Sequence, residues 1–294
     1  MKTLLITFLF LCSFWAAGAQ ESSRVIPPEQ VIEPYQVEVT FAKTVHILFP
    51  AAVKYVDLGS TDLVAGKADG AENVLRVKSA VRGFPGETNF SVITSDGVFY
   101  AFNAIYADVP GRLSIQMEDW LHKDPYGDFT QTYVRLQELG DENPLTVNRI
   151  MYTIHKKDAR LIKNIGSKRF GMQLLLRGIY IHNDLFYIHV SLSNSSNVNF
   201  DIDHIRFRIA DRKVAKRTAL QETFVEPVRA YNAIAAVKAG ETLRNVYVFQ
   251  KFTIPDDKVL IMDVFEKNGG RHQSFMIQNT DLVDAHTVEE LKIR

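Results

Sequence analysis

Three potential metal ligands lie close together in the stretch Asp201-Ile202-Asp203-His204. A divalent metal needs several such side chains to converge on one point. The pattern predicts that this stretch begins a strand, in which successive side chains point to opposite faces. Asp201 and Asp203 would therefore share a face while His204 points to the other, and we expect no metal site here.

Other candidates for catalysis are isolated from one another. Cys12 is the single cysteine and lies in a predicted signal peptide, so no thiol nucleophile is expected in the mature chain. His182 and His189 lie on the polar side of a predicted hairpin without facing each other, and we expect both at the surface. No phosphate-binding glycine loop, nucleophile elbow or zinc-protease helix motif is present. We expect a protein that is not an enzyme, with no catalytic residue, metal or cofactor.

The distribution of basic residues says more about function than these candidate metal ligands and catalytic residues do. Residues 149–177 contain eight basic residues and a single acid, Asp158. Four of the basic residues recur at spacings of seven, four and three, which on a helix would form one stripe: Arg149, Lys156, Arg160 and Lys163. This stripe is the candidate partner-binding site, and a solvated helix face is the alternative.

A second basic group lies at residues 204–217, with six basic residues against Asp211. Both groups could contact an acidic partner, anionic lipid headgroups or nucleic acid, or simply face solvent. Aromatic residues that could stack on bases are few around the stripe, only Tyr152 and Phe170, which argues against direct contact with DNA. The chain as a whole has 34 basic and 34 acidic residues, so bulk charge favours no polyanion.

The elements that would position these residues are mainly strands. The 294 residues are 46% hydrophobic and 11% aromatic, which is typical of a globular protein of about two domains. Residues 35–118 contain about seven short apolar runs separated by turn residues, among them a hairpin at Ser95-Asp96-Gly97. This pattern predicts an N-terminal β-sandwich.

Residues 119–143 are polar and turn-rich, and we interpret them as a linker. A helix should follow, capped by Asn143, with Pro144 in its first turn and its end near Gly166. Strand patterns then return, including a hairpin whose two-residue turn, Asn183-Asp184, pairs Ile181 with Phe186. In this register Leu175, Arg177, Ile179 and Ile181 share one face. Residues 144–286 therefore predict a second β-sandwich with a leading helix, followed by an exposed helical tail at 287–294.

The first 19 residues predict an export signal. Lys2 precedes an apolar run, and Ala17-Gly18-Ala19 is a small-residue cleavage site. Residues 20–34 form a polar, proline-containing leader. We therefore expect a soluble, exported protein without disulfides. Its two parts differ in charge, with a net −6 over residues 20–140 and +5 over 141–294.

Several segments of the first domain also carry a family resemblance. They are Thr44–Pro50, Tyr55–Ser60, Asn73–Lys78, Glu87–Gly97 and Phe99–Phe102. These segments resemble the TraN proteins of Bacteroides conjugative transposons, a similarity that extends over nearly the whole chain. They are also distantly similar to the TrbG/CagX outer-membrane components of type IV secretion systems, in the first domain only.

The resemblance implies a non-enzymatic structural component of a conjugative channel, in the periplasm and associated with the outer membrane. It implies a homo-oligomeric ring, a TrbI-type scaffold protein as partner and, in many systems, a small lipoprotein. The second domain has no segment that aligns with the lipoprotein-binding domain of the wider family. The alternative is an exported β-sandwich module that binds glycans or protein clients. Against a glycan platform, the mature chain would keep a single tryptophan, Trp120, in the linker.

Overall fold

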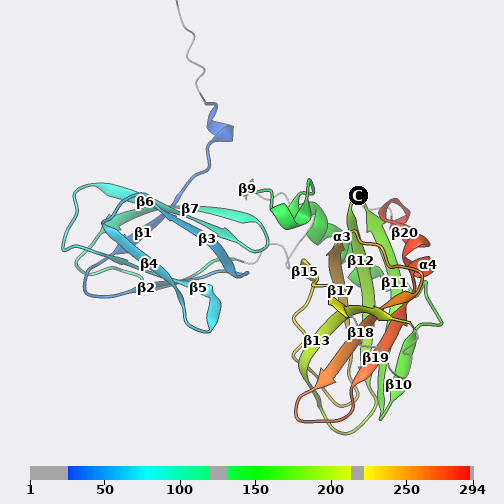
Figure 1. The fold of residues 1–294 in the computed structure, drawn as a ribbon. Coiled ribbons are helices and arrows are strands. Elements are labelled where there is room, and N and C mark those ends of the chain that lie inside the picture. The colour runs from blue at the N-terminus through cyan, green and yellow to red at the C-terminus, as the bar shows by residue number, and fades with distance from the viewer. Residues whose placement is uncertain (1–25, 119–131, 213–221, 292–294) are drawn as a thin grey trace, which may run out of the picture.

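The chain forms two β-rich bodies, which lie side by side in Figure 1. The computed structural model describes residues 26–118, 132–212 and 222–291. The predicted signal peptide, the start of the leader and the first part of the predicted linker lie outside these residues. The two bodies, and the helix before the second, confirm the predicted mainly β fold. Within the described ranges, no helix combines the length and apolar composition needed to cross a membrane.

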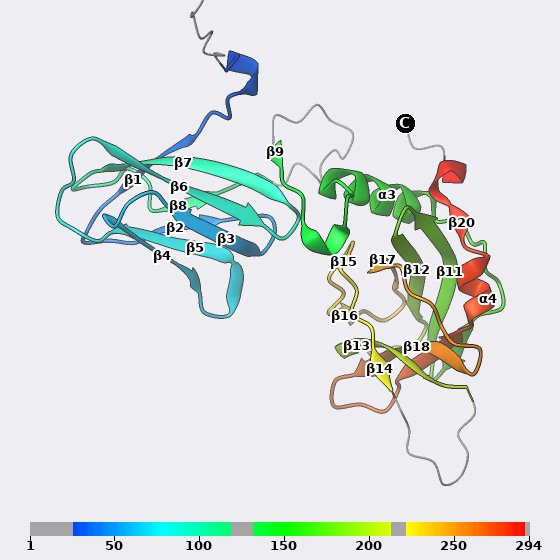
Figure 2. The ribbon, with the colours of Figure 1, turned by 45° about the horizontal axis from the view of Figure 1, so that its top comes forward.

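The first body is a sandwich of two sheets, and Figure 2 shows its strands from a second direction. One sheet has the order β1 (Tyr35–Val39), β7 (Val98–Tyr106), β6 (Glu87–Thr94) and β3 (Val53–Leu58). The other has the order β4 (Leu63–Ala68), β5 (Ala71–Ser79), β2 (Val45–Leu48) and β8 (Ser114–Gln116). Alternate apolar side chains of both sheets form one buried core, as the period of two in the sequence predicts.

The connection between the bodies is folded where it is described. Strand β9 (Thr132–Tyr133) pairs with β7, and a short 3₁₀ helix, η2 (Gln137–Leu139), follows. Leu136 and Leu139 are buried against the second body. The described half of the predicted linker thus contacts both bodies.

The second body is also a sandwich of two sheets. One sheet has the order β10 (Gly166–Arg169), β11 (Met172–His182), β12 (Leu185–Asn194), β17 (Thr242–Gln250) and β15 (Arg229–Ala230), and β20 (His286–Thr287) pairs with β11. The other has the order β14 (Thr223–Phe224), β13 (Phe200–Asp211), β18 (Lys258–Glu266) and β19 (Gln273–Ile277), and β16 (Ala236–Val237) pairs with β13. The largest hydrophobic cluster among the described residues lies between these sheets.

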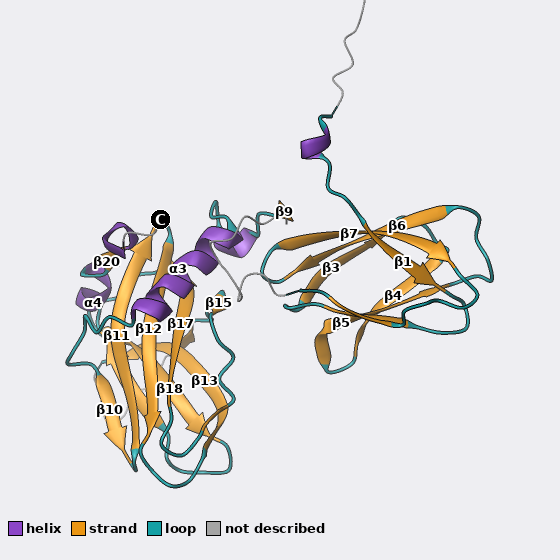
Figure 3. Cartoon of the chain, turned by 180° about the vertical axis from the view of Figure 1, so that it is seen from behind, coloured by secondary structure: helices purple, strands orange, loops and turns teal. Residues whose placement is uncertain are grey.

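The leading helix, α3 (Pro144–Lys157), lies across β12 and β17 on the outer face of the first of these sheets (Figure 3). As predicted, Asn143 caps it by accepting a hydrogen bond from the Leu145 N–H, and Pro144 occupies its first turn. The predicted end is wrong, because the helix stops at Lys157 rather than near Gly166. Asp158 follows in the left-handed conformation, with φ 49°, and turns the chain away from the helix axis.

The β11–β12 hairpin has the predicted register around its turn, with Ile181 opposite Phe186 and Ile179 opposite Ile188. A bulge at Arg177 then reverses the alternation, so Leu174 and Leu176 enter the core instead of Leu175. The same hairpin overturns a second expectation, since His189 is fully buried rather than exposed.

The C-terminal end is packed onto the second body. A short helix, α4 (Asn279–Val283), is followed by β20 and by the 3₁₀ helix η3 (Val288–Leu291). Val288 and Leu291 are buried in the cluster under α3, while Thr287, Glu289 and Glu290 are exposed, so the predicted helical tail is only partly exposed as far as residue 291. The leader contains one further 3₁₀ turn, η1 (Pro28–Gln30).

Candidate partner-binding surface

The four basic residues of the predicted stripe divide between a helix and a loop. Arg149 and Lys156 lie on α3, seven residues and so about two turns apart. Arg149 is half-buried, while Lys156 is exposed, with Nζ 5.3 Å from the centre of the Tyr152 ring. Arg160 and Lys163 lie beyond the end of α3 and are exposed. A continuous helical stripe of all four residues is therefore ruled out by the early end of the helix.

The loop that carries Arg160 and Lys163 is held in place by the bulge in β11. The Arg177 carbonyl accepts hydrogen bonds from the N–H groups of Leu161, at 2.8 Å, and Ile162, at 2.9 Å. The Arg160 guanidinium donates to the Lys163 carbonyl at 3.2 Å. The loop thus presents its two cations from an ordered backbone rather than from a helix.

Behind this loop lies an ionic centre that the sequence analysis did not identify. One carboxylate oxygen of Asp158, Oδ1, is 2.7 Å from Nε of Arg177, and the other, Oδ2, is 2.8 Å from Nη1 of Arg244. The Arg177 guanidinium also donates to the Asp158 carbonyl at 2.7 Å. The sequence did contain a signal for this centre, because Asp158 is the only acid among eight basic residues in its window.

His189 completes the centre from strand β12. Its Nε2 atom is 3.7 Å from Oδ1 of Asp158, and neither ring nitrogen has a hydrogen-bond partner among the described residues. Burial lowers the pKa of His189 to about 4, against the opposing effect of the Asp158 charge. The pKa of His155, which lies on α3, is also lowered by burial and by the charge of Arg244. A neutral, fully buried imidazole cannot reach a substrate, so this centre can fix the loop but not catalyse a reaction.

The Asp201-Ile202-Asp203-His204 stretch lies on β13, where a bulge interrupts the expected alternation. The bulge brings the His204 ring within 2.8 Å of the Asp203 carboxylate instead of turning it to the opposite face. No third ligand joins them, since the described residues contain no group of three or more His, Cys, Asp or Glu side chains suited to a metal.

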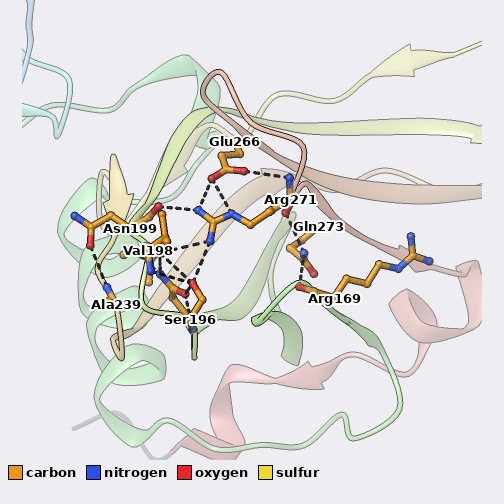
Figure 4. A network of polar contacts seen from close by, with 10 residues as sticks. Arg169, Ser196, Val198, Asn199, Ala239, Glu266, Arg271 and Gln273 are labelled. Atoms are coloured by element: carbon orange, nitrogen blue, oxygen red, sulfur yellow. Dashed lines mark hydrogen bonds and ion pairs between the residues drawn. The ribbon is translucent and has the colours of Figure 1, made fainter.

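A second polar network closes one end of the second sandwich (Figure 4). The Arg271 guanidinium donates to Oε1 of Glu266 at 2.9 Å, to the Ser196 hydroxyl at 3.1 Å and to the Asn199 carbonyl at 2.7 Å. The hydrogen bonds that Arg271 donates to Glu266 hold the pKa of this carboxyl below its usual range. Those to Ser196 and Asn199 tie the loop after β12 to the turn after β18. Because the guanidinium is paired with acceptors of its own chain, the network stabilises the fold and offers no ligand site.

Contacts between the two bodies centre on Glu138. Its carboxylate pairs with Lys54 of the first body and lies 3.4 Å from the Arg229 guanidinium of the second. Burial alone would raise the pKa of Glu138, but the hydrogen bond from Lys54 and the charge of Arg229 outweigh it and lower the pKa. Beside these contacts lies a small cavity of about 160 Å³, lined by residues of both bodies such as Asp96 and Tyr231.

Two protein families match parts of the chain. Residues 144–287 match a family described as a domain of unknown function, DUF4138, and residues 37–110 match another, DUF8473. The first match begins at the first residue of α3 and ends in β20, and the second begins in β1 and ends beyond β7. No curated protein matches the chain. The second body is thus similar to one family and the first body to another.

Proposed function

We propose that the chain is a non-enzymatic structural component of a conjugative, type IV secretion channel, acting on the periplasmic side of the outer membrane. The resemblance of residues 44–102 to TraN and TrbG/CagX proteins suggests this role. The observation that carries it structurally is a pair of open sheet edges in the first body. Strand β3 pairs only with β6, and β4 pairs only with β5, within the residues that the structure describes.

These edge strands carry exposed apolar side chains. Tyr55 on β3 is 53% exposed and Val64 on β4 is 51% exposed, and the two strands lie near each other at one side of the sandwich. Unpaired strand edges can add a strand from another chain. Repeated contacts between different surfaces of identical subunits can close into a ring. The opposite net charges of the two parts, −6 and +5, favour such head-to-tail contacts.

In this proposal the other mating-channel proteins, above all a TrbI-type scaffold, are the partners, and transferred DNA does not contact the chain directly. The test is the conjugation frequency of a donor that lacks the gene, combined with affinity purification of a tagged copy. We expect transfer to be lost and channel proteins to co-purify. Normal transfer without such partners would overturn the proposal and direct attention to glycan arrays.

A substitution on an edge strand would test whether the open edges of the first body take part in channel assembly. Lysine on an edge strand opposes strand addition, so Val64→Lys should impair transfer and assembly. The matched control is Val109→Lys, which places the same charge at a loop position that is 78% exposed. Equal transfer by the two variants would show that the β4 edge takes no part in assembly.

A further inference from the structure

The outer face of the β14-β13-β18-β19 sheet carries a row of flat side chains. Inward-facing residues of these strands, such as Phe207 and Met262, fill the core. The alternate positions face outward, where His204 pairs in register with Phe265 and Arg206 pairs with Asp263. No helix corresponding to α3 covers this sheet in the described part of the chain.

Arg206 lies in the middle of this row. Its guanidinium carbon is 5.1 Å from the centre of the Phe224 ring on one side and 5.7 Å from that of Phe265 on the other. The Phe265 ring in turn stacks on His204, with centroids 4.4 Å apart and an interplanar angle of 22°. Phe224 is 53% exposed and Arg206 is exposed. We call these four residues the Arg206 row.

The neighbouring charged side chains already have partners on the same face. Arg208 donates to Asp263 at 2.9 Å and to Glu222 at 2.6 Å, and His204 pairs with Asp203. Arg206 differs, because within the described residues it makes no hydrogen bond or ion pair, and its guanidinium interacts with two aromatic rings. Aromatic rings cover the faces of a guanidinium but leave its N–H edge able to donate.

We propose that the Arg206 row binds a carboxylate-bearing segment of a protein partner. The N–H edge of Arg206 matches a carboxylate in two-point geometry, and a guanidinium is more weakly hydrated than an ammonium, which favours such a pair. Phe224, which is 53% exposed, supplies apolar contact area beside it. Met276, which is 57% exposed, lies two strands away on β19 and extends the apolar area of the same face. A polyanion such as nucleic acid or an anionic membrane requires several cations without carboxylate partners, and the neighbouring Arg208 is already paired with Asp263 and Glu222. This inference goes beyond the channel role and does not depend on it.

The test begins with selection of short random peptides displayed on phage against the chain from residue 20 onward. The enriched peptides should contain Asp or Glu next to an aromatic or aliphatic residue. A fluorescein-labelled copy of an enriched peptide is then titrated by fluorescence anisotropy. Arg206→Gln should weaken its binding about tenfold or more, and Arg206→Lys, which keeps the charge but loses the planar group, should also weaken it.

The matched control is Arg112→Gln, which removes an exposed arginine from the first body and should leave binding unchanged. Circular dichroism verifies that each variant is folded. The proposal is overturned if no peptide is enriched, if the peptides lack acids, or if Arg206→Gln binds like the wild type. It is also overturned if the chain binds a labelled oligothymidylate, a single-stranded DNA probe, in place of the peptides and Arg206→Gln abolishes that binding. Self-association that Arg206→Gln abolishes would replace the partner with a second copy of the chain.

Discussion

His189 and Asp158 lie 3.7 Å apart, Nε2 to Oδ1, yet the histidine remains neutral because it is fully buried and the carboxylate is shared with Arg177 and Arg244. An acid next to a histidine usually favours the protonated ring. Here burial outweighs that effect, and the two arginines take up the charge of Asp158. The consequence is a pH dependence of stability.

The pKa of His189 is about 4 in the folded chain and about 6.5 when unfolded. Between these values the unfolded state binds more protons, so stability is full above pH 6.5 and falls as the pH drops toward 4, by about 3 kcal/mol for this residue. His189→Leu should remove this component, which urea unfolding at several pH values would measure. Neither nitrogen has a hydrogen-bond partner in the described part of the chain, so leucine leaves none of these residues with an unpaired polar group.

The matched control is Ser191→Ala, which changes a buried side chain of the same strand without removing a titratable group. It should retain the full pH dependence of the wild type. If His189→Leu and Ser191→Ala depend on pH equally between 6.5 and 4, His189 is not the group that titrates.

Asp158→Asn should destabilise the chain by about 2 kcal/mol, because it leaves Arg177 and Arg244 close together without a counter-charge. The value is below that for a fully buried pair, since the Asp158 side chain is 31% exposed. Asparagine tolerates the left-handed backbone of this position, so the charge is the main change. Urea unfolding at neutral pH measures the difference.

Asp184→Asn serves as the comparison, since it removes an exposed pair with Lys251 in the β11–β12 turn. An exposed pair contributes below about 1 kcal/mol. Equal losses for the two variants would mean that the Asp158 centre contributes no more than a surface ion pair.

The sequence predicted the two sandwiches because their strands alternate in hydrophobicity, and it predicted the start of α3 because capping by Asn143 is local. It missed the end of α3, since apolar residues continue at helical spacing through Ile162 and Ile165. These residues do pack on the core, but from the loop. The helix ends at Asp158, which adopts the left-handed conformation and pairs with two arginines distant in the sequence, Arg177 and Arg244.

The Arg177 bulge explains the other error. The alternation of apolar and polar residues does not reveal a single extra residue in a strand. Such a residue nevertheless moves every side chain on one side of it from one face of the sheet to the other. This explains why Leu175 was expected in the core. His189 was wrongly expected at the surface for another reason: its face of β12 is covered by α3, and its neighbours on that face, Leu185 and Tyr187, are buried in the same cluster as the helix. The four basic residues of the predicted stripe were found from the sequence alone. Their division between α3 and a loop depends on contacts between residues far apart in the chain, which local sequence patterns do not reveal.

Glu138→Gln should loosen the arrangement of the two bodies, because it removes the charge that links Lys54 to Arg229. Small-angle X-ray scattering should show a larger radius of gyration, with the thermal stability of each body retained. Arg135→Gln, which removes an exposed pair with Asp141 in the same connection, should leave the scattering unchanged. A Glu138→Gln profile identical to that of the wild type would show that other contacts fix the two bodies.

Gly97→Ala tests the direct contact between the bodies at the predicted Ser95-Asp96-Gly97 turn. Gly97 has φ +84°, and a Cβ there would lie 2.5 Å from Cγ of Pro144, the first residue of α3. Gly70 has a similar φ of +71°, but a Cβ there would meet nothing within 4 Å.

The backbone strain of alanine at positive φ, about 1–2 kcal/mol, should therefore affect both variants, and the clash only Gly97→Ala. We expect Gly97→Ala to lose at least about 1 kcal/mol more in urea unfolding than Gly70→Ala, and to enlarge the radius of gyration as Pro144 is displaced. Equal stability losses with unchanged scattering would mean that the β6–β7 turn does not rest on α3 in solution.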